Sequence, residues 1–264
     1  MGEAIVITSG KGGVGKTTTS ANIGTALALL GKKVCMVDTD IGLRNLDVVM
    51  GLENRIIYDL VDVAEDRVRL QQALVKDKRF EELYLLPAAQ TKDKDAVRPE
   101  QVKAIVDGLK RDFEYVIIDC PAGIEQGFRN AVAGADRAIV VTTPETAAVR
   151  DADRIIGLLE KEGLHGPRLI INRVRPNMMR NKDMLDIDDI CQVLAIDLLG
   201  VVPDDEQVIK SANHGEPTVM NPNTPASVAF RNIARRILGD AVPLMSLEEK
   251  KGAMARVKKF FGLG

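Results

Sequence analysis

Short apolar runs alternate with longer segments of helical periodicity along most of the chain. The runs are almost continuous in Val, Ile and Leu, which is typical of parallel strands covered on both faces. Seven runs predict strands, at 4–8, 34–38, 83–87, 115–119, 138–142, 169–172 and 199–202. Seven longer segments predict helices, at 17–30, 99–110, 126–134, 147–161, 187–194, 205–212 and 227–238. This alternation predicts an α/β fold with a doubly wound, mostly parallel sheet that binds ligands at the carboxyl ends of its strands.

A glycine-rich stretch joins the first predicted strand to the first predicted helix. It fits the phosphate-binding pattern G-x-x-x-x-G-K-[ST] in full. Glycines let successive backbone N–H groups converge without a Cβ in the way, and the helix N-terminus adds donors and a positive dipole end. The predicted ATP-binding residues are Gly10, Lys11, Gly12, Gly13, Val14, Gly15, Lys16, Thr17 and Thr18. Lys16 is expected at the β- and γ-phosphates and the Thr17 hydroxyl at Mg²⁺, unless the loop is a connection that binds nothing.

Acidic residues end two of the predicted strands. Asp38 and Asp40 follow the second strand, and Asp119 ends the strand 115–119. One carboxylate could hold Mg²⁺ through water while another orients the attacking water; alternatively, the acids only cap the next helix. The turn after Asp119, which contains Gly123, could sense the loss of a γ-phosphate.

Two single residues allow a functional and a plain interpretation. Lys11 is a second lysine in the loop, and is either solvated or directed at phosphate of its own chain or of a partner. Asn172 ends a predicted strand, where an amide suits recognition of an adenine edge but is also a common turn former.

Composition excludes several classes of function. A formal net charge of −2 on 264 residues suggests neither nucleic acid nor an acidic substrate as partner. Three isolated cysteines fit a reducing cytosol rather than a disulfide framework, and two histidines argue against a histidine-rich metal site. Without an apolar run near 18 residues or a cationic leader, we expect neither export nor membrane spanning.

The last fifteen residues, 250–264, carry five cations and no acidic side chain. At 100° per residue the apolar side chains fall within an arc of about 120°, which predicts a basic amphipathic helix lying on a membrane surface. The predicted membrane contacts are Met254, Val257, Lys258, Lys259, Phe260 and Phe261. The alternative is a helix docked on the body or on a partner. We therefore divide the chain into an ATPase domain (1–239), a linker (240–251) and a membrane-targeting helix (252–264).

Taken together, GKGGVGKTT, DTDIGLRNLD and DCPAG resemble the deviant Walker A ATPases, which include the ParA partition ATPases and the nitrogenase iron protein. Within that family the resemblance to the septum-placing members is close and covers essentially the whole chain. It includes IGLRNLDVVMG at 41–51, KDKR at 76–79, LLPAAQTKDKDA at 85–96 and VRDADRIIG at 149–157.

The resemblance implies specific roles. Lys11 would cross to the partner's ATP in an ATP-dependent homodimer, and Lys16 would hold phosphate. Asp40 would position the attacking water, making Lys11, Lys16 and Asp40 the catalytic set. The remaining implied roles are metal binding by Thr17, Asp38 and Asp119, adenine contact by Asn172, switching by Asn45 and Gly123, and partner binding by Asp151 and Asp153.

It also implies a peripheral protein on the cytoplasmic face of the bacterial inner membrane. Such a protein binds ATP and Mg²⁺, attaches to anionic lipids, recruits a division inhibitor and responds to a topological regulator. The alternatives are a DNA-segregation ATPase, an iron–sulfur carrier, for which paired cysteines are missing, and a related ATPase that places flagella.

Overall fold

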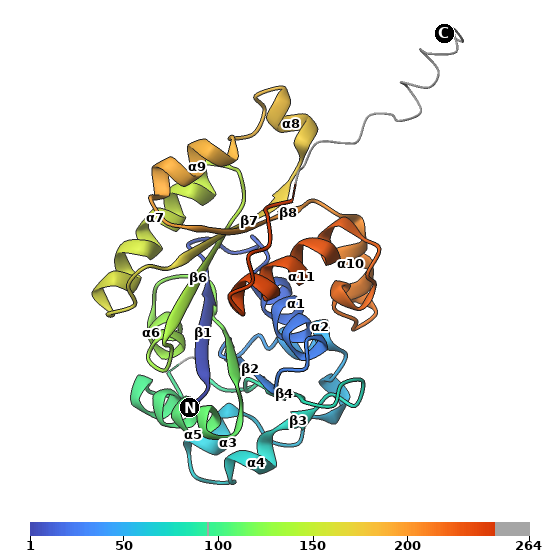
Figure 1. The fold of residues 1–264 in the computed structure, drawn as a ribbon. Coiled ribbons are helices and arrows are strands. Elements are labelled where there is room, and N and C mark those ends of the chain that lie inside the picture. Colours follow the sequence, from blue (N-terminus) through green and yellow to red (C-terminus); the bar gives the residue numbers. More distant parts are fainter. Residues whose placement is uncertain (94, 246–264) are drawn as a thin grey trace, which may run out of the picture.

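The computed structural model describes residues 1–93 and 95–245 and is built around an eight-stranded sheet (Figure 1). The strands are β1 Glu3–Thr8, β2 Val34–Asp38, β3 Val75–Lys76, β4 Leu83–Leu86, β5 Tyr115–Asp119, β6 Arg137–Thr142, β7 Arg168–Val174 and β8 Leu198–Pro203. Their order is β3-β4-β2-β5-β1-β6-β7-β8, with β3 antiparallel to β4 and the other neighbours parallel. The seven predicted strands and the mostly parallel sheet are confirmed.

Seven helices correspond to the predicted helical segments. They are α1 Lys16–Leu29, α5 Pro99–Asp112, α6 Gln126–Val132, α7 Thr146–Lys161, α9 Ile187–Leu194, α10 Glu206–Asn213 and α11 Pro225–Ile237. The elements that the sequence pattern does not predict are short. They are β3, the helices α2 Leu46–Met50, α3 Leu60–Ala64, α4 Leu70–Ala73 and α8 Pro176–Arg180, and the 3₁₀ turns η1 Glu53–Arg55 and η2 Thr218–Met220.

Both faces of the sheet are covered, as a doubly wound fold requires. On one face alternate strand residues such as Val6 and Ile118 pack into a core that includes residues of α5, α6 and α7. On the other face their neighbours, such as Ile5 and Ile117, pack with residues of α1 and α11. Figure 1 shows α1, α10 and α11 together on one side of the sheet and α5, α6 and α7 on the other.

The helix that follows the glycine-rich loop is buried on almost every side. Along α1 the chain is small and apolar or hydroxylated, and ten residues between Lys16 and Leu27 are buried. Gly24 lies so near β2 that a Cβ added there would meet the Met36 Sδ at 2.5 Å. Because α1 lacks a solvated face along most of its length, its start, and with it the end of the loop, is fixed by packing.

Strand register brings the predicted phosphate and metal residues together. Asp38 of β2 is paired with Asp119 of β5, and Asp119 is also paired with Ile7 of β1. The loop that leaves β1 after Thr8 therefore begins beside both carboxylates.

The chain leaves the sheet next to β8. The Arg236 guanidinium, near the end of α11, donates to the carbonyl oxygens of Val242 at 2.8 Å, Pro243 at 2.7 Å and Leu199 at 2.9 Å. The predicted membrane-targeting helix 252–264 and the linker residues 246–251 lie outside the described residues. Within the described part of the chain, no helix combines the length and apolarity needed to cross a membrane.

Candidate nucleotide-binding site

The loop between β1 and α1 needs glycine at defined positions. Gly13 and Gly15 have φ values of 80° and 98°, in the left-handed region that side chains disfavour. Gly10 has a different constraint, because a Cβ there would lie 2.1 Å from the backbone oxygen of Asp151 in α7. The loop is thus held against α7 at its start and turns sharply into α1 at its end.

Asn172 of β7 holds this loop through a hydrogen bond. Its Nδ2 donates to the Val14 carbonyl oxygen at 2.8 Å, and the side chain is buried. A Cβ on Gly15 would lie 2.4 Å from the same Nδ2. The strand does not end at Asn172, as the sequence pattern predicts, but continues to Val174. Contact between Asn172 and adenine stays a prediction, with its amide nitrogen already engaged by the loop.

Lys16 begins α1 and lies in the field of buried acids. Its side chain is 7% exposed, and the ion pairs found in the described part of the chain do not include it. One turn later, the Ser20 hydroxyl donates to Asp119 Oδ1 at 2.8 Å. Ser20 was not predicted as a site residue, although its spacing of four from Lys16 places both on one helix face. A lysine ammonium at a helix N-terminus is well suited to bind phosphate.

Asp38 and Asp119 form a buried pair of carboxylates. They are 1% and 2% exposed. Burial, reinforced by the Asp119 charge, raises the pKa of Asp38 above its usual range. Burial also raises the pKa of Asp119, although hydrogen bonds from Thr17 and Ser20 and the Lys16 charge oppose the shift. A divalent cation would relieve this crowding, and the Thr17 hydroxyl at the same place completes a donor set that suits Mg²⁺.

Asp38 also caps the next helix. Its Oδ1 accepts from the Asp40 N–H at 2.9 Å and its Oδ2 accepts from the Leu46 N–H, the first of α2, at 3.2 Å. The capping interpretation is therefore correct for Asp38, and binding of Mg²⁺ by the same carboxylate stays a prediction. Asp40 is half-buried at the start of the turn that leads to α2, and Asn45 is exposed just before that helix.

Lys11 is placed at the rim of the loop. Its ammonium lies 3.7 Å from the Glu145 carboxylate, and the two side chains are 45% and 60% exposed. Such a long, solvated ion pair contributes little and leaves the lysine able to move. Gly123, on the predicted sensing turn, has a φ of 100° and open space around its Cβ position.

Helix α7 connects the loop to a possible partner surface. Asp151 meets Gly10 through its backbone, whereas Asp153, two residues later, is exposed. Asp153 lines a shallow cavity of about 320 Å³ together with Ile124, which is 47% exposed. The partner-binding role of both aspartates stays a prediction.

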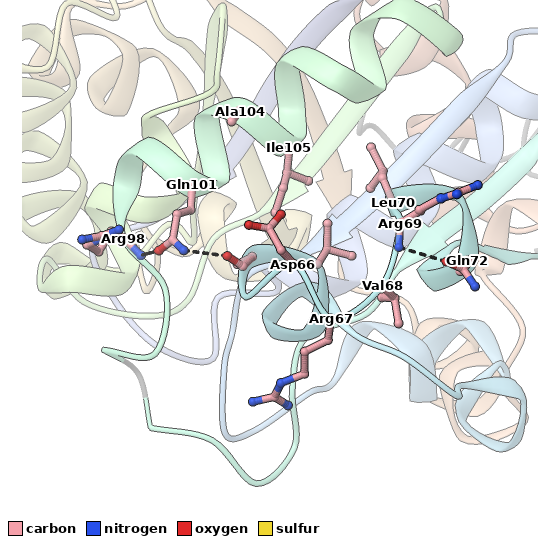
Figure 2. A pocket seen from close by; sticks show the side chains of 12 residues that line it. Asp66, Arg67, Val68, Arg69, Leu70, Gln72, Arg98, Gln101, Ala104 and Ile105 are labelled. Carbon is pink, nitrogen blue, oxygen red and sulfur yellow. Dashed lines mark hydrogen bonds between the residues drawn. The ribbon is translucent and has the colours of Figure 1, made fainter.

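Two further cavities were not predicted. One of about 370 Å³ lies at the carboxyl ends of β6 and β7 and is lined by Glu145, Arg173 and Arg175, among others. Arg173 directly follows Asn172 in the sequence. The prediction made for Asn172 therefore already pointed to the region of this cavity. A larger cavity of about 780 Å³ lies between α3, α4 and α5 (Figure 2), and none of the predicted site residues lines it.

Cys120 is a small buried residue beside the site. Its thiol accepts a hydrogen bond from the Thr8 hydroxyl at 3.5 Å, and burial raises its pKa to about 12.

Within the described residues, no group of three or more His, Cys, Asp or Glu side chains is arranged to hold a metal ion.

Comparisons with known proteins identify the family of this chain. A family model, the CobQ/CobB/MinD/ParA nucleotide binding domain, matches residues 5–219. The septum site-determining protein MinD of Bacillus subtilis is 71% identical over 266 residues, covering 100% of this chain and 99% of that protein. The corresponding protein of Thermotoga maritima is 52% identical over 265 residues, covering 99% of this chain and 98% of its own length.

Solved structures give the same result. The MinC:MinD cell division protein complex of Aquifex aeolicus contains a chain with a TM-score of 0.88 and 48% identity, covering 94% of this chain and 100% of that one. MinD of Pyrococcus horikoshii, solved with Mg-ADP, has a TM-score of 0.82 and 30% identity, covering 92% of this chain and 100% of that one. The chain belongs to the septum site-determining MinD ATPases, within the CobQ/CobB/MinD/ParA nucleotide-binding family.

Proposed function

We propose that this protein is an Mg²⁺-dependent ATPase that dimerises on binding ATP, attaches to the inner membrane and recruits a division inhibitor until hydrolysis releases it. One observation carries the nucleotide part of this proposal. Lys16, a buried residue at the start of α1, lies in the electrostatic field of Asp119, which is paired in register with Asp38. This combination suits a phosphate chain bound together with a divalent cation.

In the proposed reaction, water attacks the γ-phosphate in line with the leaving group. The backbone N–H groups of the loop and Lys16 hold the phosphates, and Thr17, Asp38 and Asp119 hold Mg²⁺ directly or through water. Mg²⁺, when bound, neutralises charge on the phosphate oxygens. Asp40 orients the attacking water, and Lys11 of the partner protomer adds positive charge as the transition state forms.

Attachment to the membrane rests on the sequence of the tail, 252–264. Each buried Phe or aliphatic side chain contributes about 1.5–3 kcal/mol, and each Lys or Arg near anionic lipid about 1 kcal/mol. Ordering roughly a dozen residues costs on the order of 1 kcal/mol each, so one tail binds weakly. Two tails on a dimer gain avidity of about 100-fold or more. Control of dimerisation is then sufficient to control membrane residence.

Recruitment of an inhibitor is supported by the relatives. The Aquifex aeolicus MinD that resembles this chain is solved in complex with MinC. On this chain we assign the docking surface to α7, around the exposed Asp153 and the neighbouring shallow cavity. A topological regulator of the Min type would act on the same dimer.

A sedimentation assay tests the proposal. The full chain should bind and hydrolyse ATP and should sediment with phosphatidylglycerol-containing vesicles when ATP and Mg²⁺ are present. Deleting 252–264 should abolish sedimentation and leave the affinity for ATP unchanged, because the tail lies outside the nucleotide site. Phosphatidylcholine vesicles are the lipid control. The tail assignment fails if the truncated chain still sediments, and DNA binding that needs ATP but not the tail would favour a segregation ATPase.

A further inference from the structure

Arg79, the last residue of the KDKR stretch, contacts three separate segments of the chain. It lies in the turn between β3 and β4, and its Nε and Nη2 donate to the buried Asp77 carboxylate at 2.7–3.2 Å. Its Nη1 donates to the Gly215 carbonyl oxygen at 2.9 Å. Its Nη2 also donates to the Met50 carbonyl oxygen. One guanidinium therefore links the β3–β4 turn, the end of α2 and the turn after α10.

The two segments bridged by Arg79 touch each other directly. Gly51 ends α2 with a φ of 64°, and Gly215 follows α10 with a φ of 67°. A Cβ on Gly51 would lie 2.7 Å from the Gly215 oxygen, and a Cβ on Gly215 would lie 2.5 Å from the Gly51 Cα. The carbonyl of Met50 is thus held in a tight junction, where Arg79 satisfies an acceptor at the C-terminus of α2.

The opposite end of α2 reaches the metal site. The Leu46 N–H, at its first residue, donates to Asp38 Oδ2 at 3.2 Å. A five-residue helix is about 7.5 Å long and is not stable by itself, so tertiary contacts at its ends fix its position. Asp38 holds one end of α2, and Arg79 holds the other.

We infer that Arg79 is a positioning residue for the magnesium site: it holds the C-terminus of α2 so that the Leu46 N–H fixes the orientation of the Asp38 carboxylate. The inference rests on the proposed function, because it assigns Asp38 to Mg²⁺. Replacing the direct hydrogen-bond partner of a metal ligand typically changes metal affinity by about 10- to 100-fold; Arg79 acts on Asp38 less directly, through α2, so we expect the low end of that range. Arg79→Lys keeps the charge, but its three donors sit on one nitrogen and cannot reproduce the guanidinium fork, which pairs with the Asp77 carboxylate through two nitrogens while reaching both carbonyls.

The test separates magnesium-dependent from magnesium-independent nucleotide binding. The affinity of the full chain for mant-ADP is measured in EDTA and in Mg²⁺, and the ratio of the two dissociation constants reports the coupling. In Arg79→Lys this ratio should fall about tenfold, while the affinity in EDTA stays close to that of the unmodified protein. Arg235→Lys is the matched control, since Arg235 also pairs with an aspartate, Asp240, at 2.9 Å but lies on α11.

The outcomes distinguish the inference from the proposed function. An unmodified protein that does not bind mant-ADP overturns both. The positioning role alone is overturned if the unmodified protein binds mant-ADP more tightly with Mg²⁺ and Arg79→Lys shows the same ratio of dissociation constants. In that case the variant would differ only in a lower melting temperature.

Hydrogen–deuterium exchange on the unmodified protein provides a second measurement that needs no variant. Adding Mg²⁺ to the ADP complex should raise protection together at 46–51, 77–80 and 214–216. Protection that rises only in the glycine-rich loop contradicts the coupling.

Discussion

At the scale of single residues, the site combines groups that a motif identifies with groups that only the fold brings near. Lys16 and Thr17 follow from the phosphate-binding pattern. The hydrogen bond from the Asn172 amide to the Val14 carbonyl does not follow from that pattern, because the two residues are 158 positions apart in the sequence. Sequence identified Asn172 as a polar strand residue, and the structure provides the reason for its burial.

Replacing Asn172 tests whether it acts on the loop or on the base. Asn172→Ala leaves the Val14 carbonyl without a buried donor, at a cost of about 1–3 kcal/mol, and loosens the loop. We expect the affinities for ATP and for GTP to fall by similar factors of about ten, measured by competition against mant-ADP. A loss confined to ATP would instead establish the adenine contact.

A matched control for this variant lies elsewhere in the fold. Asn130 is also buried, at 2% exposed against 7% for Asn172, and its Nδ2 donates to the Val97 carbonyl oxygen at 2.9 Å. Asn130→Ala should lower the melting temperature as Asn172→Ala does but leave nucleotide affinity unchanged. A fall in affinity with Asn130→Ala would show that general destabilisation explains both results.

At the scale of elements, every strand of four or more residues and every helix of seven or more was predictable from hydrophobic pattern. The short helices were not, because four or five residues do not complete enough turns to display a period. Helix α2 shows what replaces the pattern. Its position depends on Asp38 at one end and Arg79 at the other, two contacts that no local sequence signal contains.

Two glycines inside helices should respond in opposite ways to alanine. Gly157 of α7 has open space where a Cβ would be, so Gly157→Ala should gain about 0.5–1 kcal/mol from helix propensity. Gly24→Ala in α1 gains the same propensity but would place a Cβ 2.5 Å from the Met36 Sδ. Overpacking of that kind costs about 1–3 kcal/mol, which outweighs the gain.

Thermal unfolding measures both changes. For a chain of this size, 1 kcal/mol corresponds to a shift of about 2–4 °C, upward for Gly157→Ala and downward for Gly24→Ala. If the melting temperatures of both variants shift in the same direction, the packing around Gly24 in α1 does not control the effect of alanine on stability.

At the scale of the whole molecule, Lys11 connects nucleotide state to assembly in the proposed function. Among the described residues its ammonium forms one loose ion pair, with Glu145, which a partner's phosphate can replace at little cost. Lys11→Ala should therefore remain monomeric with ATP and Mg²⁺, while the unmodified protein dimerises, as measured by size exclusion with light scattering. ATP binding itself should persist because Lys16 is retained.

A lysine far from the loop provides the control for this variant. Lys33 is similarly exposed and is paired with Glu82 at 4.0 Å. Lys33→Ala should dimerise normally. An ATP-dependent dimer of Lys11→Ala would refute the role of Lys11 across the interface and leave the rest of the nucleotide site as described.

The hydrogen bonds of Arg236 have a geometric consequence for membrane attachment. They fix Val242 and Pro243 beside β8, and Met245 packs against the core, so the link to the predicted membrane-targeting helix begins no earlier than residue 246. The six residues 246–251 could span at most about 22 Å even if fully extended. That length is shorter than the diameter of roughly 45 Å expected for a body of this size, so an attached molecule could not rotate freely above the bilayer. The edge of the sheet at β8 would stay turned toward the lipid, which leaves the opposite edge at β3 and β4 facing the cytoplasm.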